Sequence, residues 1–151
     1  MTAKRSYPML AVFILIVAGI AMSGIHFQPG AWYADLDKPF WTPPNWLFPP
    51  VWSVLYLMIA VAGWLIFAGS DAWMKALWVV QLVLNGLWSW LFFGLHRIGP
   101  GLVDMVALLV SIAALFAMAL PRQRAVAWLI GPYLAWVAYA LSLVASIYVL
   151  N

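Results

Sequence analysis

The chain has 151 residues, of which 68% are hydrophobic and only 7% are charged, and its formal net charge is +3. A water-soluble domain is about 25% charged, so this chain lacks the polar surface that a water-facing shell requires. The chain contains no cysteine, which excludes disulfides, thiolate metal sites and cysteine nucleophiles. The small positive charge does not indicate a nucleic-acid partner, and the composition predicts an integral membrane protein.

Five stretches are long and apolar enough to span a bilayer, which takes roughly 20 apolar residues for about 30 Å of hydrocarbon. Because these runs are apolar on every face, they indicate helices rather than the strands of a barrel. The predicted fold is all-α, a single domain (residues 1–151) that forms an integral membrane bundle of five transmembrane helices. The expected helices cover about 9–27, 46–67, 73–93, 102–120 and 126–150.

The first span has a second interpretation as a cleavable signal peptide. Lys4 and Arg5 precede an apolar core, and the run Ala-Met-Ser-Gly at 21–24 resembles a cleavage site. A retained helix is favoured because the apolar run continues to Phe27, beyond a typical signal core.

The distribution of Lys and Arg predicts the orientation, because basic residues concentrate on the cytoplasmic side of a membrane protein. The N-terminal tail and the second and fourth loops share one side, and their basic residues are Lys4, Arg5, Lys75, Arg122 and Arg124. The other side holds only Lys38 and Arg97. We therefore expect the N-terminus inside and the C-terminus outside.

The first connection, residues 28–45, is long for a compact bundle, and loops of that length are usually functional. It reads QPGAWYADLDKPFWTPPN, and its prolines fix φ and favour extended geometry in the residues before them. We expect an ordered loop without regular structure that buries its aromatic side chains (Trp32, Tyr33, Phe40 and Trp41) on the end of the bundle. The favoured interpretation is a semi-rigid lid over a cavity, and the alternative is an aromatic belt at the headgroups.

A polar stripe runs along the third span, next to Trp88, and consists of Gln81, Asn85 and Ser89. Intramembrane polar side chains face the bundle interior, where they hydrogen-bond to one another or to a ligand. We expect Asn85 to meet a ligand and Gln81 to have a structural role.

Aromatic residues recur at helical spacing in the second and fifth spans. Trp52 and Tyr56 are four residues apart and share a face of the second span. One face of the fifth span carries Pro132, Trp136 and Ala140, with Tyr133 adjacent. A cavity lined in this way suits a large, flat, apolar ligand with few polar edges.

A second stripe on the fifth span consists of the small residues Ala138, Ser142 and Ser146. Small residues allow helices to approach closely within a membrane. This stripe therefore predicts a packing face, either for another helix of the bundle or for a second copy of the chain in a homodimer.

Conventional catalytic groups are scarce. Asp104 is the only acid within a predicted span, and we expect it in the first turn of its helix, where the dipole favours an anion and Arg97 can reach it. His26 and His96 fall at helix ends, and interfacial positions are preferred over haem ligation across a pocket. The sequence contains no metal-ligand cluster and no catalytic Ser/His/Asp spacing. Indole, which is electron-rich, would have to carry any chemistry in the cavity.

Three blocks of sequence are distinctive: WYADLDKPFWTPP at 32–44, the segments 81–85, 92–94 and 102–104, and PYLAWVAYA at 132–140. These blocks resemble the TspO/MBR family, which includes the bacterial tryptophan-rich sensory proteins and the mitochondrial translocator protein, or peripheral benzodiazepine receptor. The run WYADLDKPFWTPP at 32–44 resembles the first-loop signature of that family. Residues 81–85, 92–94 and 102–104 resemble its third and fourth helices, and PYLAWVAYA at 132–140 resembles its fifth. The blocks occur in order over nearly the whole chain, and together they are specific.

The resemblance implies a five-helix bundle that binds porphyrins such as protoporphyrin IX, and isoquinoline and benzodiazepine ligands, in a pocket beneath the first loop. Trp52 and Trp136 match two tryptophans implicated in bacterial porphyrin photodegradation. Other matching loop and pocket positions are Trp32, Trp41, Pro43, Tyr56, Asn85, Ser89 and Ala140. Trp88 and Tyr133, their neighbours, complete the predicted ligand-binding set.

Three functional hypotheses follow. The preferred one is a membrane protein that binds tetrapyrroles and senses or regulates their levels, with no required cofactor. The second is a light- and oxygen-dependent enzyme that degrades porphyrins with Trp52 and Trp136. The third is a transporter of porphyrins or other apolar solutes, although the sequence has no convincing inverted repeat. A cholesterol pattern found in animal members is incomplete here, because no basic residue follows Tyr148.

Overall fold

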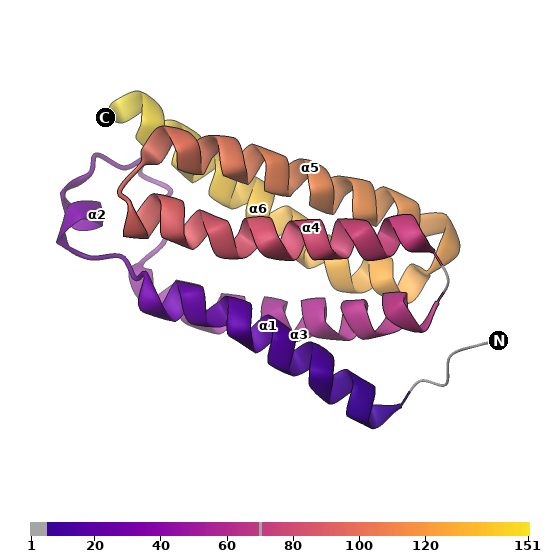
Figure 1. Cartoon of the computed structure of the whole chain (residues 1–151). Coiled ribbons are helices and arrows are strands. Elements are labelled where there is room, and N and C mark those ends of the chain that lie inside the picture. Colours follow the sequence, from indigo (N-terminus) through magenta and orange to yellow (C-terminus); the bar gives the residue numbers. More distant parts are fainter. Residues whose placement is uncertain (1–5, 70) are drawn as a thin grey trace.

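The computed structural model describes residues 6–69 and 71–151, which form a bundle of long helices (Figure 1). Within these residues, five helical segments are long and apolar enough to cross a membrane, and no strand occurs. The segments are α1 (Tyr7–His26), η1 with α3 (Asn45–Leu47 and Phe48–Ala68), α4 with the π-helical η2 (Ala72–Ser89 and Trp90–Gly94), α5 (Ile98–Arg122) and α6 (Arg124–Leu150). The all-α, five-span prediction is confirmed.

Local chemistry sets the start of α4. The side chain of Asp71 accepts hydrogen bonds from the backbone N–H groups of Trp73 (3.0 Å) and Met74 (3.1 Å), which have no partner within the helix. The same carboxylate lies 3.6 Å from the guanidinium Nε of Arg122 at the end of α5. The α3–α4 and α5–α6 connections are therefore joined at the end of the bundle opposite the 28–45 loop.

Helix α1 changes neighbours along its length. In its N-terminal half the ring of Phe13 lies 5.1 Å from that of Phe67 on α3 and 5.3 Å from that of Trp78 on α4. In its C-terminal half Ile20 packs against Gly86 of α4, where a Cβ on the glycine would lie 3.4 Å from the isoleucine. Helix α1 therefore leaves α3 and follows α4 toward the loop, and this crossing makes room for a cavity.

The loop 28–45, which we call the lid loop, has more regular structure than expected. Helix α2 (Ala31–Asp35) forms within it, and η1 forms at its end, so the expectation of a loop without regular structure is wrong. The reason is local: residues 31–35 contain no proline, whereas the prolines gather at 39, 43 and 44. The ammonium of Lys38 donates hydrogen bonds to the carbonyls of Tyr33 (2.7 Å), Ala34 (3.1 Å) and Leu36 (2.8 Å), and thereby closes the C-terminal end of α2.

Only half of the lid-loop aromatic residues pack on the bundle. Tyr33 is buried, and Trp32 stacks on the imidazole of His96 with ring centroids 4.5 Å apart. Phe40 is 95% exposed and Trp41 is 40% exposed, so the expectation that they would be buried is wrong. The two rings contact each other edge-on at 5.1 Å.

The α4–α5 junction corrects the expectation for Asp104. Helix α5 begins at Ile98, one turn earlier than expected, so Asp104 lies in the second turn instead of the first. Asp104 is buried and both its carboxylate oxygens lack a hydrogen-bond partner, whereas Arg97 is exposed. Within the described ranges the only ion pair joins Arg122 and Asp71, so the expected Arg97–Asp104 contact does not form.

The close packing of Gly63 against Trp78 gives a stability prediction. A Cβ at Gly63 would lie 2.5 Å from the indole ring, and the indole cannot retreat because its Nε1 donates to the carbonyl of Ile59 at 3.0 Å. We expect Gly63→Ala to lower the free energy of unfolding by about 1–3 kcal/mol through overpacking. The measurement is the thermal unfolding midpoint in detergent micelles. Gly19→Ala is the matched control, because no atom lies within 4 Å of a Cβ there, and equal midpoints for both variants would contradict the prediction.

Candidate functional site

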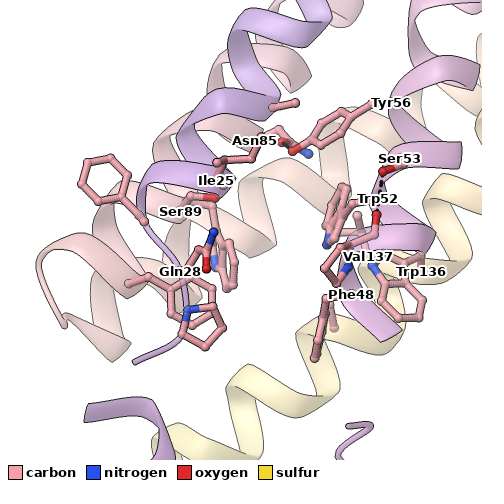
Figure 2. A pocket seen from close by; sticks show the side chains of 18 of the residues that line it. Ile25, Gln28, Phe48, Trp52, Ser53, Tyr56, Asn85, Ser89, Trp136 and Val137 are labelled. Atoms are coloured by element: carbon pink, nitrogen blue, oxygen red, sulfur yellow. Dashed lines mark hydrogen bonds between the residues drawn. The ribbon is translucent and has the colours of Figure 1, made fainter. Parts of the chain in front are cut away.

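A cavity of about 440 Å³ lies in the half of the bundle next to the lid loop (Figure 2). This volume falls within the range of about 300–1,000 Å³ that is typical of small-molecule sites. All five spans contribute to its wall, and the lid loop contributes residues such as Gln28 and Tyr33. The cavity is therefore a site between helices, closed at one end by the loop.

Seven residues of the predicted ligand-binding set line this cavity. They come from α3, α4 and α6, and they are Trp52, Tyr56, Asn85, Trp88, Ser89, Trp136 and Ala140. Figure 2 shows Trp52 and Trp136 on one side of the cavity, across from Ser89. The polar stripe on α4 faces the bundle interior, whereas on α6 Trp136 and Ala140 line the cavity and Pro132, one turn earlier, is exposed.

Four other predicted residues do not line the cavity. Trp32 packs against His96 and Phe92, Trp41 is partly exposed on the lid loop, and Pro43 lies partly buried in the same loop. Tyr133 is completely buried behind the cavity wall. The structure therefore gives these four residues positions around the cavity and not in its lining.

Several lining residues were not predicted from the sequence. Helix α1 and the residue after it form a largely apolar wall of the cavity, which consists of Ala21, Gly24, Ile25 and Phe27. The sequence of α1 has no polar or aromatic stripe from which this wall could have been predicted. Phe48 lies four residues before Trp52 and contacts the ring of Trp136 at 6.0 Å, so helical spacing could have identified it. The position of α1 depends on packing across the bundle, which the sequence pattern does not report.

A chain of hydrogen bonds joins three spans beside the cavity. The phenol of Tyr56 on α3 donates to Oδ1 of Asn85 on α4 (2.8 Å), and Nδ2 of Asn85 donates to the phenol oxygen of Tyr133 on α6 (2.9 Å). The Tyr133 phenol then donates to Oε1 of Gln81 (2.9 Å). Asn85 keeps one N–H and one lone pair for another partner. It therefore lines the cavity and also holds the helices together.

Aromatic rings form much of the remaining wall. The rings of Trp52 and Tyr56 stack with centroids 5.3 Å apart, and Tyr133 contacts Trp52 edge-on at 6.2 Å. On the other side the indole of Trp88 stacks on the ring of Phe92 at 5.1 Å. Offset-stacked and edge-on contacts of this kind fix ring orientation and favour a flat aromatic guest.

The lid loop is fixed to α6 at two points. The phenol of Tyr139 donates to the carbonyl of Trp41 at 2.6 Å. The side chain of Asn151 accepts from the backbone N–H of Asp37 (3.0 Å) and donates to the carbonyl of the same residue (2.9 Å). Burial raises the pKa of the phenol of Tyr33, a residue of this loop, and the nearby Tyr139 raises it further, so Tyr33 lines the cavity as a neutral phenol.

The histidines lie away from the cavity. His26 is exposed and contacts the ring of Phe27 at 4.7 Å, and His96 stacks on Trp32. Neither residue lines the cavity, so they do not face each other across it. Among residues 6–69 and 71–151, no group of three His, Cys, Asp or Glu side chains could hold a metal ion.

Comparison with known proteins identifies the family. The profile of the TspO/MBR family matches residues 10–150. The chain belongs to the TspO/MBR family. It is 39% identical to the tryptophan-rich protein TspO of Archaeoglobus fulgidus over 148 residues, which cover 94% of this chain and 96% of that protein. The predicted family is therefore confirmed.

Two further relatives carry names that bear on function. The chain is 30% identical to the tryptophan-rich sensory protein of Cereibacter sphaeroides, with 93% of this chain and 89% of that protein covered. It is 33% identical to the human translocator protein, with 79% and 74% covered. Family membership and five helices able to cross a membrane make this TspO/MBR member an integral, multi-pass membrane protein.

The buried phenol of Tyr133 gives a second prediction. In Tyr133→Phe, the amides of Asn85 and Gln81 each lose a hydrogen-bond partner, and we expect the free energy of unfolding to fall by about 1–2 kcal/mol. The measurement is thermal unfolding in detergent. Tyr148→Phe, at an exposed position, should leave the midpoint unchanged. An unchanged midpoint for Tyr133→Phe would show that the hydrogen-bond chain contributes little.

The fixation of the lid loop gives a third prediction. In Asn151→Ala the backbone N–H of Asp37 loses its acceptor, so its amide hydrogen should exchange with solvent at least several-fold faster. Hydrogen exchange read by mass spectrometry on peptides covering 36–45 measures this change. Peptides from α4 are the internal control and should exchange at the original rate. Unchanged exchange around Asp37 would contradict the prediction.

Proposed function

We propose that this TspO/MBR protein binds a tetrapyrrole such as protoporphyrin IX in the cavity beneath the lid loop, and that it senses or regulates porphyrin levels. The observation that carries this proposal is the wall of the cavity, where Trp52, Trp88 and Trp136 surround a space of about 440 Å³. A flat aromatic macrocycle can stack on indole rings in such a space. The lining contains no charged side chain among the described residues, which suits an apolar ring.

The polar lining groups support one orientation of the ligand. Gln28 and Asn45 line the loop end of the cavity and are exposed there. Protoporphyrin IX carries two propionate groups on one edge, and these anions are costly to bury without a partner. The macrocycle would therefore lie between the helices, with its propionates at the loop end near the two amides and water.

The sensory part of the proposal comes from the relatives. A sensory role is in the name of the Cereibacter sphaeroides protein, which matches this chain over most of its length. We extend that role to this chain because conventional catalytic groups are absent from the cavity lining in the part of the chain that the structure describes. Transport stays a prediction from the sequence. A homodimer also stays a prediction, and Ala138 and Ser142 on α6 are exposed and would be available to a second copy.

We also propose that the N-terminus lies inside and the lid loop outside. The ion pair between Asp71 and Arg122 joins the α3–α4 and α5–α6 connections at one end of the bundle. Three basic residues lie in or next to these connections: Lys75, Arg122 and Arg124. The opposite end carries Lys38 and Arg97. Lys4 and Arg5, which also contribute to the sequence argument, lie outside the described residues. This asymmetry in basic charge supports the orientation.

Photodegradation of the bound porphyrin is a second candidate function. Trp52 and Trp136 come from different helices, α3 and α6, and both line the cavity (Figure 2). A porphyrin bound between the helices would contact both electron-rich indoles while it absorbs light. The positions of these two side chains support this candidate, and light distinguishes it from simple binding.

A binding titration tests the proposed function. Adding protoporphyrin IX in darkness to the purified protein should quench Trp fluorescence and shift the porphyrin absorbance, with saturation at micromolar concentration. We expect Trp52→Phe and Trp136→Phe each to weaken binding by about 3- to 10-fold, since each removes an indole contact worth about 0.5–1.5 kcal/mol. Trp128→Phe is the control, because that residue is 80% exposed and does not line the cavity.

The outcomes separate the hypotheses. An absence of saturable binding would contradict the binding proposal, and equal affinities for the Trp52 and Trp128 variants would contradict the assigned site. The same samples are then illuminated in the presence of oxygen, and the loss of porphyrin absorbance is followed. If Trp52→Phe and Trp136→Phe lose porphyrin as fast as the unmodified protein, photodegradation does not depend on these indoles.

A further inference from the structure

The cavity has a side that no helix covers completely. At the far end of the bundle α1 packs closely on α3, where a Cβ at Gly63 would lie 2.9 Å from the ring of Phe13. Near the lid loop α1 packs on α4 instead, where a Cβ at Gly24 would lie 3.9 Å from Oγ of Ser89. The C-terminal half of α1 and the first turns of α3 thus form separate walls of the cavity.

Three residues on these two walls line the cavity and also face outward. Ile25 on α1 is 59% exposed, and Pro49 and Ser53 on α3 are exposed, yet all three belong to the cavity lining. Figure 2 shows Ile25 and Ser53 on different sides of the cavity. A residue that both lines a cavity and faces outward marks an opening. Because α1 and α3 are membrane spans, this opening faces the bilayer.

The chemistry of this rim is compatible with hydrocarbon. Ile25 is aliphatic, and Pro49 has no backbone N–H. The hydroxyl of Ser53 donates to the carbonyl of Pro49 at 2.7 Å, so its proton is already satisfied within the helix. The loop end of the cavity is different, because the amide side chains of Gln28 and Asn45 are exposed there and favour water.

Helix α1 is the most weakly held wall of the cavity. Only Phe13 and Val17 are buried along its length, and no α1 residue after Val17, on the side of this opening, is buried. Its Ser23 hydroxyl donates to the carbonyl of Ile20 in the same helix, and no side-chain hydrogen bond joins α1 to another helix within the described ranges. Apolar contacts between helices have little driving force inside a membrane, because lipid tails are equally apolar. The C-terminal half of α1 can therefore move at low cost.

We propose that the gap between the C-terminal half of α1 and the first two turns of α3, which we call the lateral portal, admits a flat apolar ligand to the cavity directly from the bilayer. This inference rests on the proposed porphyrin binding. An amphiphilic macrocycle dissolved in the membrane keeps its carboxylates at the headgroups and its ring in the adjacent hydrocarbon. The lateral portal lies in the loop-side half of the spans, at the depth of that ring. The ring can thus reach Trp52 without crossing water.

Single cysteines labelled with a bulky maleimide test the lateral portal, and the cysteine-free chain makes the labelling specific. The positions are Ile25 and Ser53 at the portal, Gln28 at the loop end, and Leu57 as the control. Leu57 is 56% exposed on α3 but does not line the cavity. Each variant is reconstituted in phosphatidylcholine vesicles and mixed in darkness with vesicles that contain protoporphyrin IX. Stopped-flow quenching of Trp fluorescence gives the association rate.

Adducts at Ile25 and at Ser53 should slow association by about tenfold or more, whereas the Leu57 adduct should leave the rate unchanged. If the portal adducts behave like the Leu57 adduct, or if the Gln28 adduct slows association more than either of them, the lateral portal is overturned. Loss of saturable binding in the unlabelled protein would instead contradict the proposed function.

A second measurement reads the portal without porphyrin. A bimane fluorophore on Ser53→Cys or Ile25→Cys should be quenched by phosphatidylcholine brominated on its acyl chains, as should the same fluorophore on Leu57→Cys. A fluorophore on Gln28→Cys should be quenched much less. If the portal fluorophores resemble the one at Gln28, this opening faces water and the inference fails, whatever the porphyrin result.

Discussion

The structure depends on a short chain of hydrogen bonds placed where water is absent. Tyr56, Asn85, Tyr133 and Gln81 connect α3, α4 and α6 through contacts of 2.8–2.9 Å. Between membrane helices the hydrophobic effect offers little attraction, so polar contacts and close packing decide which faces meet. An amide or phenol left without a partner in this environment is costly, and each member of the chain therefore fixes the orientation of the others.

This network leaves two kinds of cavity wall: a firm wall, whose helices are joined by side-chain hydrogen bonds, and a weak wall, formed by α1 without such bonds among the described residues. Helices α3, α4 and α6 carry the hydrogen-bonded and stacked side chains, including Trp52 over Tyr56. Helix α1 carries apolar residues and lies outside the network. The lid loop is closer to the firm wall, because Tyr139 and Asn151 on the α6 side hold its backbone. Movement that admits a ligand is therefore easiest at α1.

The proposed porphyrin binding and the proposed photodegradation place the same demand on the cavity. In the two proposed functions the indoles of Trp52 and Trp136 provide stacking surface in the dark and electron-rich partners in the light, and the described lining holds no charged or metal-binding group. Binding needs only their shape and position, whereas degradation also needs their electrons. The aromatic wall is thus the common requirement of the two proposals, which differ in whether light and oxygen are needed.

The sequence by itself determined the spans and their inward faces, because a helix in hydrocarbon must satisfy its own backbone and turn its polar side chains inward. The stripe of Gln81, Asn85 and Ser89 followed from that rule. Tertiary structure decided what depends on distant partners. Helix α2, the true start of α5, the burial of Tyr133 behind the wall, and the crossing of α1 from α3 to α4 all belong to this group. The lid loop is held across 98 and 114 residues of sequence, and such contacts arise from the packed bundle and not from any local pattern.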